Sequence, residues 1–217
     1  MFKRLFNSLS RYYRNYTVEH RRYLAKLNDL DRFNDDFAKS IAWTPIVKSR
    51  IRTSFSTKRL VKSKDNIVSF KPSIQFLLFN TFFIGVPSII LVKSLIMNNF
   101  NYDDKWLIIL FLSVFILLGI TYLLWGLKPI SFDLNIRRFI KYTFQGGYEK
   151  ISIDDIYALQ MIEDMSSQDE TYYELNLVMK NQNRINIICH NDDKAIRKQA
   201  KELSKIVSIP FWDMTSF

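Results

Sequence analysis

Residues that could carry chemistry gather around His190. Cys189 directly precedes it, and this pair could supply a nucleophile and its base. In a regular strand, however, neighbouring side chains point to opposite faces, which keeps Cys189 and His190 apart. Asp192 and Asp193 could add metal ligands, but acidic residues also favour the start of a helix. We therefore predict no catalytic site and no metal site.

The other residues that could carry chemistry form no recognised motif. The carboxylate pairs Glu163-Asp164 and Asp169-Glu170 lie in or beside a polar loop, where solvated surface is the simpler interpretation. The sequence has no nucleophile elbow, phosphate-binding glycine loop, dinucleotide fingerprint or zinc-protease motif. We expect a non-catalytic protein without a cofactor.

A long apolar stretch determines where the rest of the chain lies relative to a membrane. Residues 106–125 read WLIILFLSVFILLGITYLLW and contain no charge. At helical rise they span about 30 Å, the thickness of the hydrocarbon core of a bilayer. Trp106, Tyr122 and Trp125 would lie at the membrane interfaces, where amphipathic rings are favoured. The sequence predicts a transmembrane helix over 106–127.

A second apolar stretch, 74–92, is less uniform. It contains Asn80, Gly85 and Pro87, which are tolerated in a membrane where neighbouring helices satisfy the freed polar groups. Lys93 follows its end and can extend to the lipid headgroups. Asn80 and Pro87 could mark a pore or binding site, although an interhelical hydrogen bond and a packing kink are favoured.

Positive charge is distributed unevenly around these two spans. The net charge is +10; of 31 Lys and Arg residues, 17 precede the first span, 2 lie in the connecting segment 93–105 and 12 follow the second span, beginning with Lys128. By the positive-inside rule, both termini face the cytoplasm and the connecting segment faces out. We predict a multi-pass protein of the bacterial inner membrane, without a cleaved signal peptide.

The chain after the second span alternates in hydrophobicity as strands do. Ile140, Tyr142 and Phe144 alternate with more polar neighbours before a glycine-rich turn, and about six strands in a meander end near His190. A helix then begins with Asn191 as its N-cap and stops before a proline. This order predicts an α+β fold: a small antiparallel sheet or split barrel closed by a C-terminal helix, similar to a pleckstrin-homology (PH) domain.

Residues 46–73 contain a short strand hairpin with its turn at Lys64-Asp65-Asn66. The hairpin emerges on the same side of the predicted membrane as the C-terminal tail. We predict that its strands complete the sheet, so that the two transmembrane helices are an insertion into one cytoplasmic domain.

The first 45 residues are basic and aromatic. Apolar residues between Arg22 and Trp43 recur at three- and four-residue steps, which predicts an amphipathic helix. This arm could lie on an anionic lipid surface, dock a partner or pack on the tail domain. Four basic residues could contact the lipid surface: Lys3, Arg4, Arg11 and Arg14.

Five blocks of sequence between Leu60 and Asp213 carry a family resemblance: FKPSIQFLLF, KPISFDLN, ISIDDIYALQMI, YYELNLVMKNQNRINIICHNDD and IPFWD. They resemble a bacterial family of small two-span membrane proteins with a PH-like tail. More distantly, the layout resembles the photosystem I assembly factor of cyanobacteria and chloroplasts. The resemblance implies a membrane-bound assembly or binding module, and it implies no catalytic residue.

The predicted segments are an amphipathic arm at 1–45, a strand hairpin at 46–73, transmembrane helices at 74–92 and 106–127 joined by an external loop at 93–105, and a PH-like domain at 128–217. We expect this domain to bind a protein partner or a lipid headgroup, with membrane lipids as further partners and no nucleic acid. Homo-oligomerisation stays open. The alternatives are an immunity protein that neutralises an antibacterial toxin, and a channel or transporter subunit, which would need oligomers.

Overall fold

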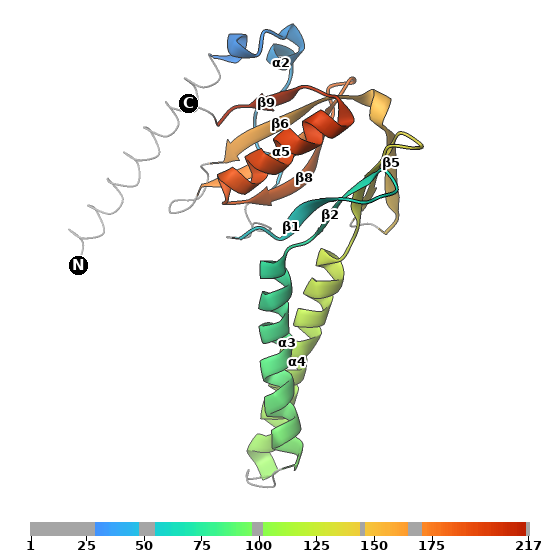
Figure 1. The fold of residues 1–217 in the computed structure, drawn as a ribbon. Coiled ribbons are helices and arrows are strands. Elements are labelled where there is room, and N and C mark those ends of the chain that lie inside the picture. Colours follow the sequence, from blue (N-terminus) through green and yellow to red (C-terminus); the bar gives the residue numbers. More distant parts are fainter. Residues whose placement is uncertain (1–28, 48–54, 97–101, 144–145, 165–170, 216–217) are drawn as a thin grey trace, which may run out of the picture. The chain divides into compact units, whose positions relative to one another are not determined.

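The structure, a computed structural model, describes residues 29–47, 55–96, 102–143, 146–164 and 171–215. It divides into two compact units. Unit 1 is drawn from Met1–Ser54 and Asp154–Phe217, and unit 2 from Phe55–Ile153. Figure 1 shows the elements of both units, which are described separately below.

Unit 2 is built on a five-stranded antiparallel sheet in the order β1-β2-β3-β4-β5. Val68, Phe132 and Phe139 are fully buried on one face of it, as the register of β2, β3 and β4 requires. The hairpin turn between β1 and β2 uses a left-handed Asn66 (φ 55°). The strands are β1 (Lys58–Lys62), β2 (Ile67–Pro72), β3 (Ile130–Asp133), β4 (Arg138–Tyr142) and β5 (Tyr148–Ser152).

Two long helices interrupt this sheet in sequence, although the strands on either side of them are neighbours. α3 (Ile74–Ile96) and α4 (Tyr102–Gly126) lie between β2 and β3, which pair directly. Both helices are long and apolar enough to cross a membrane. Within a continuous apolar stretch of 18 residues in each helix, only 11% and 6% of the residues are buried, whereas the core helix of a soluble domain is mostly buried.

The two helices pack closely at positions that only glycine allows. A Cβ atom at Gly126 would overlap the ring of Phe76, which is 1% exposed, and one at Gly119 would lie 2.6 Å from the side chain of Ile84. Small residues of this kind let helix backbones approach in an apolar environment. Gly85, in contrast, has no atom within 4 Å of a built Cβ.

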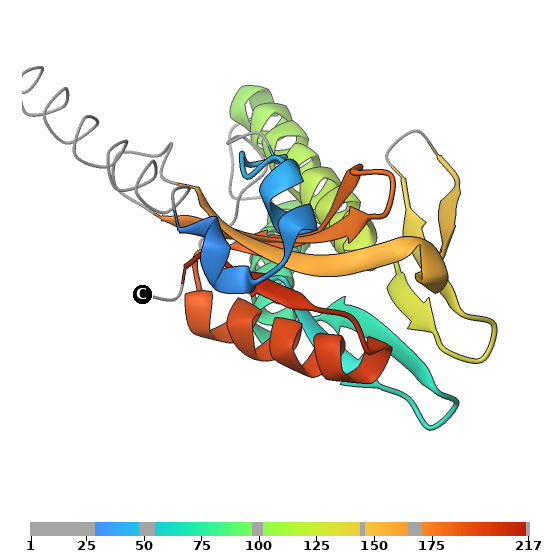
Figure 2. The same ribbon diagram turned by 90° about the horizontal axis from the view of Figure 1, so that it is seen from above.

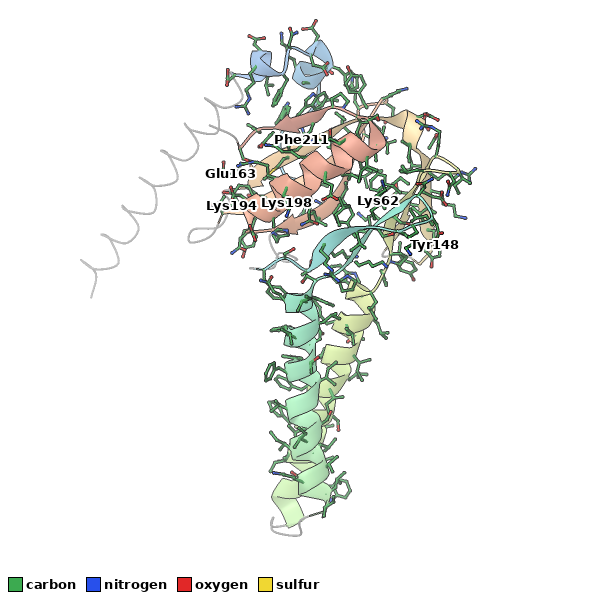
Figure 3. All side chains as sticks on the ribbon, viewed as in Figure 1. Lys62, Tyr148, Glu163, Lys194, Lys198 and Phe211 are labelled. Carbon is green, nitrogen blue, oxygen red and sulfur yellow. The ribbon has the colours of Figure 1, made fainter. Side chains whose placement is uncertain are left out.

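Unit 1 contains a four-stranded sheet in the order β8-β7-β6-β9. α5 (Asp193–Val207) covers one face of it, and the short helices η1 (Leu30–Phe33) and α2 (Asp36–Ser40) lie on the other side (Figure 2). α5 is amphipathic: it buries Ile196, Ala200, Leu203 and Val207, whereas Lys194 and Lys198 are exposed (Figure 3). The strands are β6 (Ile156–Asp164), β7 (Tyr172–Met179), β8 (Arg184–His190) and β9 (Phe211–Asp213), and η3 (Ile153–Asp155) precedes β6.

Aromatic rings fill the face of this sheet opposite α5. Trp43 and Trp212 have ring centroids 6.1 Å apart, and Phe33 stacks on Trp43 at 5.3 Å. The Trp43 indole Nε1 donates to the Ala38 carbonyl at 2.9 Å, so its one polar atom is satisfied inside the core. The segment before the membrane helices is thereby part of the same core as the C-terminal strand β9.

The structure confirms an α+β fold with antiparallel sheets and two apolar helices, but it corrects the barrel. The described strands form two open sheets, and β9 runs parallel to β6. The strands of residues 128–217 lie in two sheets: β3–β5 join β1 and β2, and β6–β9 form the second sheet.

Two predicted helix features are also wrong. The continuous helix expected between Arg22 and Trp43 is interrupted in its described part, because Asn34 adopts a left-handed conformation (φ 47°) and Asp35 an extended one. The N-cap of α5 is Asp192, whose side chain accepts the N–H of Ala195. The predicted lipid-surface residues lie outside the described residues: Lys3, Arg4, Arg11 and Arg14.

Candidate functional site

Three lysines gather at the end of the five-stranded sheet where α3 begins and α4 ends. Lys58 is the first residue of β1 and pairs with Pro72, two residues before α3. Lys128 follows α4 by two residues, and Lys141 in β4 pairs with the first residue of β3. We call Lys58, Lys128 and Lys141, together with Tyr142, the lysine edge.

The Lys58 ammonium has one hydrogen-bond acceptor, and that acceptor is neutral. Its Nζ donates to the backbone carbonyl of Lys128 at 2.7 Å, and no Asp or Glu among the described residues forms an ion pair with it. The Lys128 ammonium lies 4.0 Å from the centroid of the Tyr142 ring, a cation–π contact. Two of the three Lys58 protons therefore have no acceptor within the described protein.

The lysine edge is electrostatically unfavourable by itself. Burial lowers the pKa of Lys58 from 10.5 to about 8, and the positive charge of Lys141 adds to the shift. Burial also lowers the pKa of Lys141, against the opposing effect of Glu149, its partner in β5. Poorly hydrated ammonium groups close to each other favour the binding of an anion. The arrangement offers hydrogen-bond donors and positive charge, the chemistry that binds phosphate oxygens.

The predicted membrane-interface residues lie at the two ends of the helix pair. Tyr122 and Trp125 stack at 6.3 Å between ring centroids near the end of α4, close in sequence to Lys128. Lys93 is in the last turn of α3, and Trp106, 69% exposed, lies near the start of α4, at the end of the hairpin away from the sheet (Figure 1). These positions are those an aromatic and basic belt would occupy, and the belt itself stays a prediction.

A second candidate site lies in unit 1, where polar side chains of the sheet hold an extended segment. We call residues 42–47 the strap. Glu174 in β7 is fully buried, and its two carboxylate oxygens accept the backbone N–H groups of Ile46 and Val47 at 2.9 and 2.8 Å. Hydrogen bonds from backbone N–H groups thus stabilise this buried carboxylate.

Further polar residues on the same face complete this network. Gln160 donates to the strap carbonyl of Ala42 at 3.1 Å, and Arg184 donates to that of Thr44 at 2.8 Å. Asn176 donates to Glu174 at 3.3 Å. All four side chains contact backbone groups or one another, so this face recognises an extended chain through its backbone.

The residues around His190 form a helix start, as expected from their sequence. The His190 Nδ1 accepts the N–H of Asp192 at 3.1 Å, while Asp192 caps α5. Burial lowers the pKa of His190 to about 4. Cys189 pairs with Glu174 and His190 with Tyr173, on opposite faces of the sheet. Within the described ranges, no three His, Cys, Asp or Glu side chains are grouped to hold a metal ion.

Asn80 and Pro87 both lie within the single helix α3. The Asn80 amide donates to the Phe76 carbonyl one turn earlier at 2.8 Å, and α3 continues through Pro87. Neither residue forms a described contact that indicates a pore. The interhelical hydrogen bond predicted for Asn80 is therefore not among the described contacts, and the kink predicted at Pro87 stays a prediction.

Comparison with known proteins adds no family. No family model matches the sequence, and no curated protein matches it. The resemblance carried by the five sequence blocks stays a prediction, as does the PH-like architecture.

Sequence reasoning treated Lys58 and Lys141 only as positive charges flanking the spans. It could not bring them together, because their proximity depends on the antiparallel pairing of β1–β4 across a two-helix insertion. Glu174 was likewise missed, since its alternation with apolar neighbours is typical of a solvated strand face. The sequence offered only a weak sign that Glu174 is buried, namely its place in a predicted strand rich in apolar residues.

Proposed function

We propose that the chain is a non-catalytic integral membrane protein that spans the bacterial inner membrane twice and presents its two sheets to the cytoplasm as a binding module. The observation that carries the proposal is the helix hairpin inserted between two neighbouring strands. Its two helices expose apolar side chains along their whole length, including Phe82 and Trp106, each 69% exposed. Water disfavours such a surface, and a bilayer accommodates it.

The orientation rests on charge and on chain connectivity. Both ends of the hairpin return to one sheet, so the sheet must lie on one side of the membrane. The basic residues Lys58, Lys128 and Lys141 flank this side, and basic flanks favour the cytoplasm.

Membrane insertion and orientation are tested by extraction and labelling of the full chain in cells. The chain is expected to stay in the membrane pellet after alkaline carbonate treatment. In a Cys189→Ser background, Asn98→Cys should react with a membrane-impermeant maleimide in intact spheroplasts, and Asp65→Cys only after lysis. Release by carbonate, or reaction of Asp65→Cys before lysis, would contradict the proposal.

Partner binding is tested on the same protein extracted with its surrounding lipids. A stoichiometric complex with a second protein is expected on gel filtration. A chain that elutes alone at every concentration would argue against an assembly role.

A further inference from the structure

The lysine edge is the place in unit 2 where the protein leaves a charge incompletely satisfied. Lys58 has a single carbonyl acceptor, and the ammonium of Lys128 faces an aromatic ring. Such an ammonium group is stabilised by an anion with several oxygen acceptors. A phosphate group supplies them, whereas a single neutral acceptor does not.

The position of the lysine edge matches the depth of lipid phosphates. Lys58 pairs with Pro72, two residues before the first residue of α3, and Lys128 lies two residues past α4. The headgroup region of each leaflet is roughly 5–8 Å thick beyond the hydrocarbon core. Residues within two positions of a membrane helix end therefore lie at headgroup depth.

The surrounding charges favour an anion. The elements that pack beside Lys58 contribute Lys141 from β4 and Lys128 after α4, and Glu149 in β5 acts on Lys141. On the opposite face of the β1–β2 pair, Arg59 and Lys71 are paired and exposed. Basic side chains in this part of unit 2 thus outnumber the one carboxylate, Glu149, that acts on them.

We propose that the lysine edge binds the phosphate of an anionic membrane lipid, with Lys58 and Lys128 as the donors and Tyr142 holding Lys128 in place. This inference rests on the membrane insertion proposed above. It goes further by naming the ligand class and the residues that bind it. Lys141 in β4 adds positive charge that acts on Lys58.

The test uses the full chain in a neutral detergent. It is incubated with equal amounts of phosphatidylglycerol and phosphatidylcholine of identical acyl chains, and bound lipids are counted by native mass spectrometry. The wild-type chain should retain phosphatidylglycerol preferentially. The double variant Lys58→Gln/Lys128→Gln should lose this preference by about tenfold or more.

Two control variants separate the site from general charge and from misfolding. Lys62→Gln removes an exposed lysine at the other end of the same strand, away from α3 (Figure 3), and should leave lipid retention unchanged. Lys58→Arg keeps the charge and should retain phosphatidylglycerol, which shows that the fold tolerates the substitution. Equal retention by the double variant and Lys62→Gln would overturn the proposal.

The pH dependence gives a second readout. Because Lys58 loses its proton near pH 8, phosphatidylglycerol retention should fall between pH 7 and pH 9 in the wild-type chain. Arginine stays charged, so Lys58→Arg should flatten this fall. Identical pH profiles for the two proteins would contradict the role of Lys58.

A final arm distinguishes the source of the phosphate. Inorganic phosphate is titrated into the detergent-solubilised chain by calorimetry. Binding that the double variant abolishes, combined with equal retention of the two lipids, would assign the site to a free anion and overturn the lipid assignment. Failure of the lipid test in a chain that resists carbonate extraction would refute this inference alone, whereas release by carbonate would refute the proposed function.

Discussion

Glu174 in unit 1 is buried and Lys58 in unit 2 is half-buried. The two charged side chains differ in how many of their hydrogen bonds find a partner in the protein. Glu174 accepts two backbone N–H groups and an asparagine amide. Lys58 donates to one carbonyl, and the positive charge of Lys141 adds to the lowering of its pKa. A complete set of partners is typical of a structural role, and an incomplete one indicates a missing ligand.

The comparison predicts effects of opposite sign when each charge is removed. Removing Glu174 leaves the part-buried N–H groups of Ile46 and Val47 without their acceptor, whereas removing Lys58 relieves an unfavourable charge.

Glu174→Ala should destabilise unit 1 by about 2–4 kcal/mol, because the part-buried N–H groups of Ile46 and Val47 lose their acceptor. Hydrogen exchange of these two amides should accelerate by the same free energy. Glu202, exposed on α5, is the matched control, and Glu202→Ala should leave exchange unchanged. Slow exchange of both amides in Glu174→Ala would show that the carboxylate does not hold the strap.

His190 extends the comparison to a buried group that is neutral. Its Nε2 is buried and has no hydrogen-bond partner among the described residues, and its folded pKa of about 4 is below the ordinary 6.5. Between these two values the unfolded chain binds more protons than the folded one, so stability falls as the pH is lowered from 6.5 to 4. The loss amounts to about 3 kcal/mol.

The measurement is the free energy of unfolding of unit 1 across this pH range, followed by hydrogen exchange in β7 and β8. His190→Gln should flatten the dependence, while the exposed Lys194→Gln should preserve it. If His190→Gln and the wild-type chain lose stability in parallel, the acid sensitivity belongs to carboxylates elsewhere.

Lys58→Met should stabilise unit 2 in detergent without anionic lipid, by about 1–2 kcal/mol after allowance for solvent screening. The folded pKa of Lys58 is lowered from 10.5 to about 8, so the unfavourable charge is fully present below pH 8. The gain should disappear as the pH rises through this window to 10.5. Thermal unfolding at pH 7 and pH 10.5 measures it, with Lys62→Met as the control. A destabilised Lys58→Met would place Lys58 with Glu174 as a structural charge.

The local features of the fold were largely predictable from the sequence, and the long-range ones were not. Uncharged runs of about twenty residues locate α3 and α4, and alternation of apolar and polar residues locates β3–β8. Both signals are local, because they can be recognised from residues close together in the sequence. The parallel strand β9 was missed, since three residues after a helix carry no periodic signal. The division of the tail between two sheets depends on which strands pair, and alternation does not encode pairing partners.

The candidate sites follow the same rule. Asp192 and Asp193 were correctly interpreted as residues of a helix start because this role depends on adjacent residues, although Asn191 was predicted as the N-cap that Asp192 provides. The arm between Arg22 and Trp43 was expected as one helix because its apolar spacing is helical. In the structure, Asn34 and Asp35 interrupt it so that Phe33 and Trp43 can pack on the sheet. Tertiary packing of aromatic side chains outweighed local helical preference.

Asn80 offers the smallest and most selective test, because it is a buried polar residue inside the hairpin. Its amide donates to the Phe76 carbonyl, but its Oδ1 is buried and has no partner in the part of the chain that the structure describes. Asn80→Leu loses one hydrogen bond and removes one unsatisfied atom, so the two effects should nearly cancel, within about 1 kcal/mol. Unfolding of the reconstituted chain measures the change. Leu78→Ala, at an exposed position on the same helix, is a control for altered lipid contact. A large loss of stability, or loss of an oligomer, would mean that Asn80 bonds to a second copy and would revive the channel alternative.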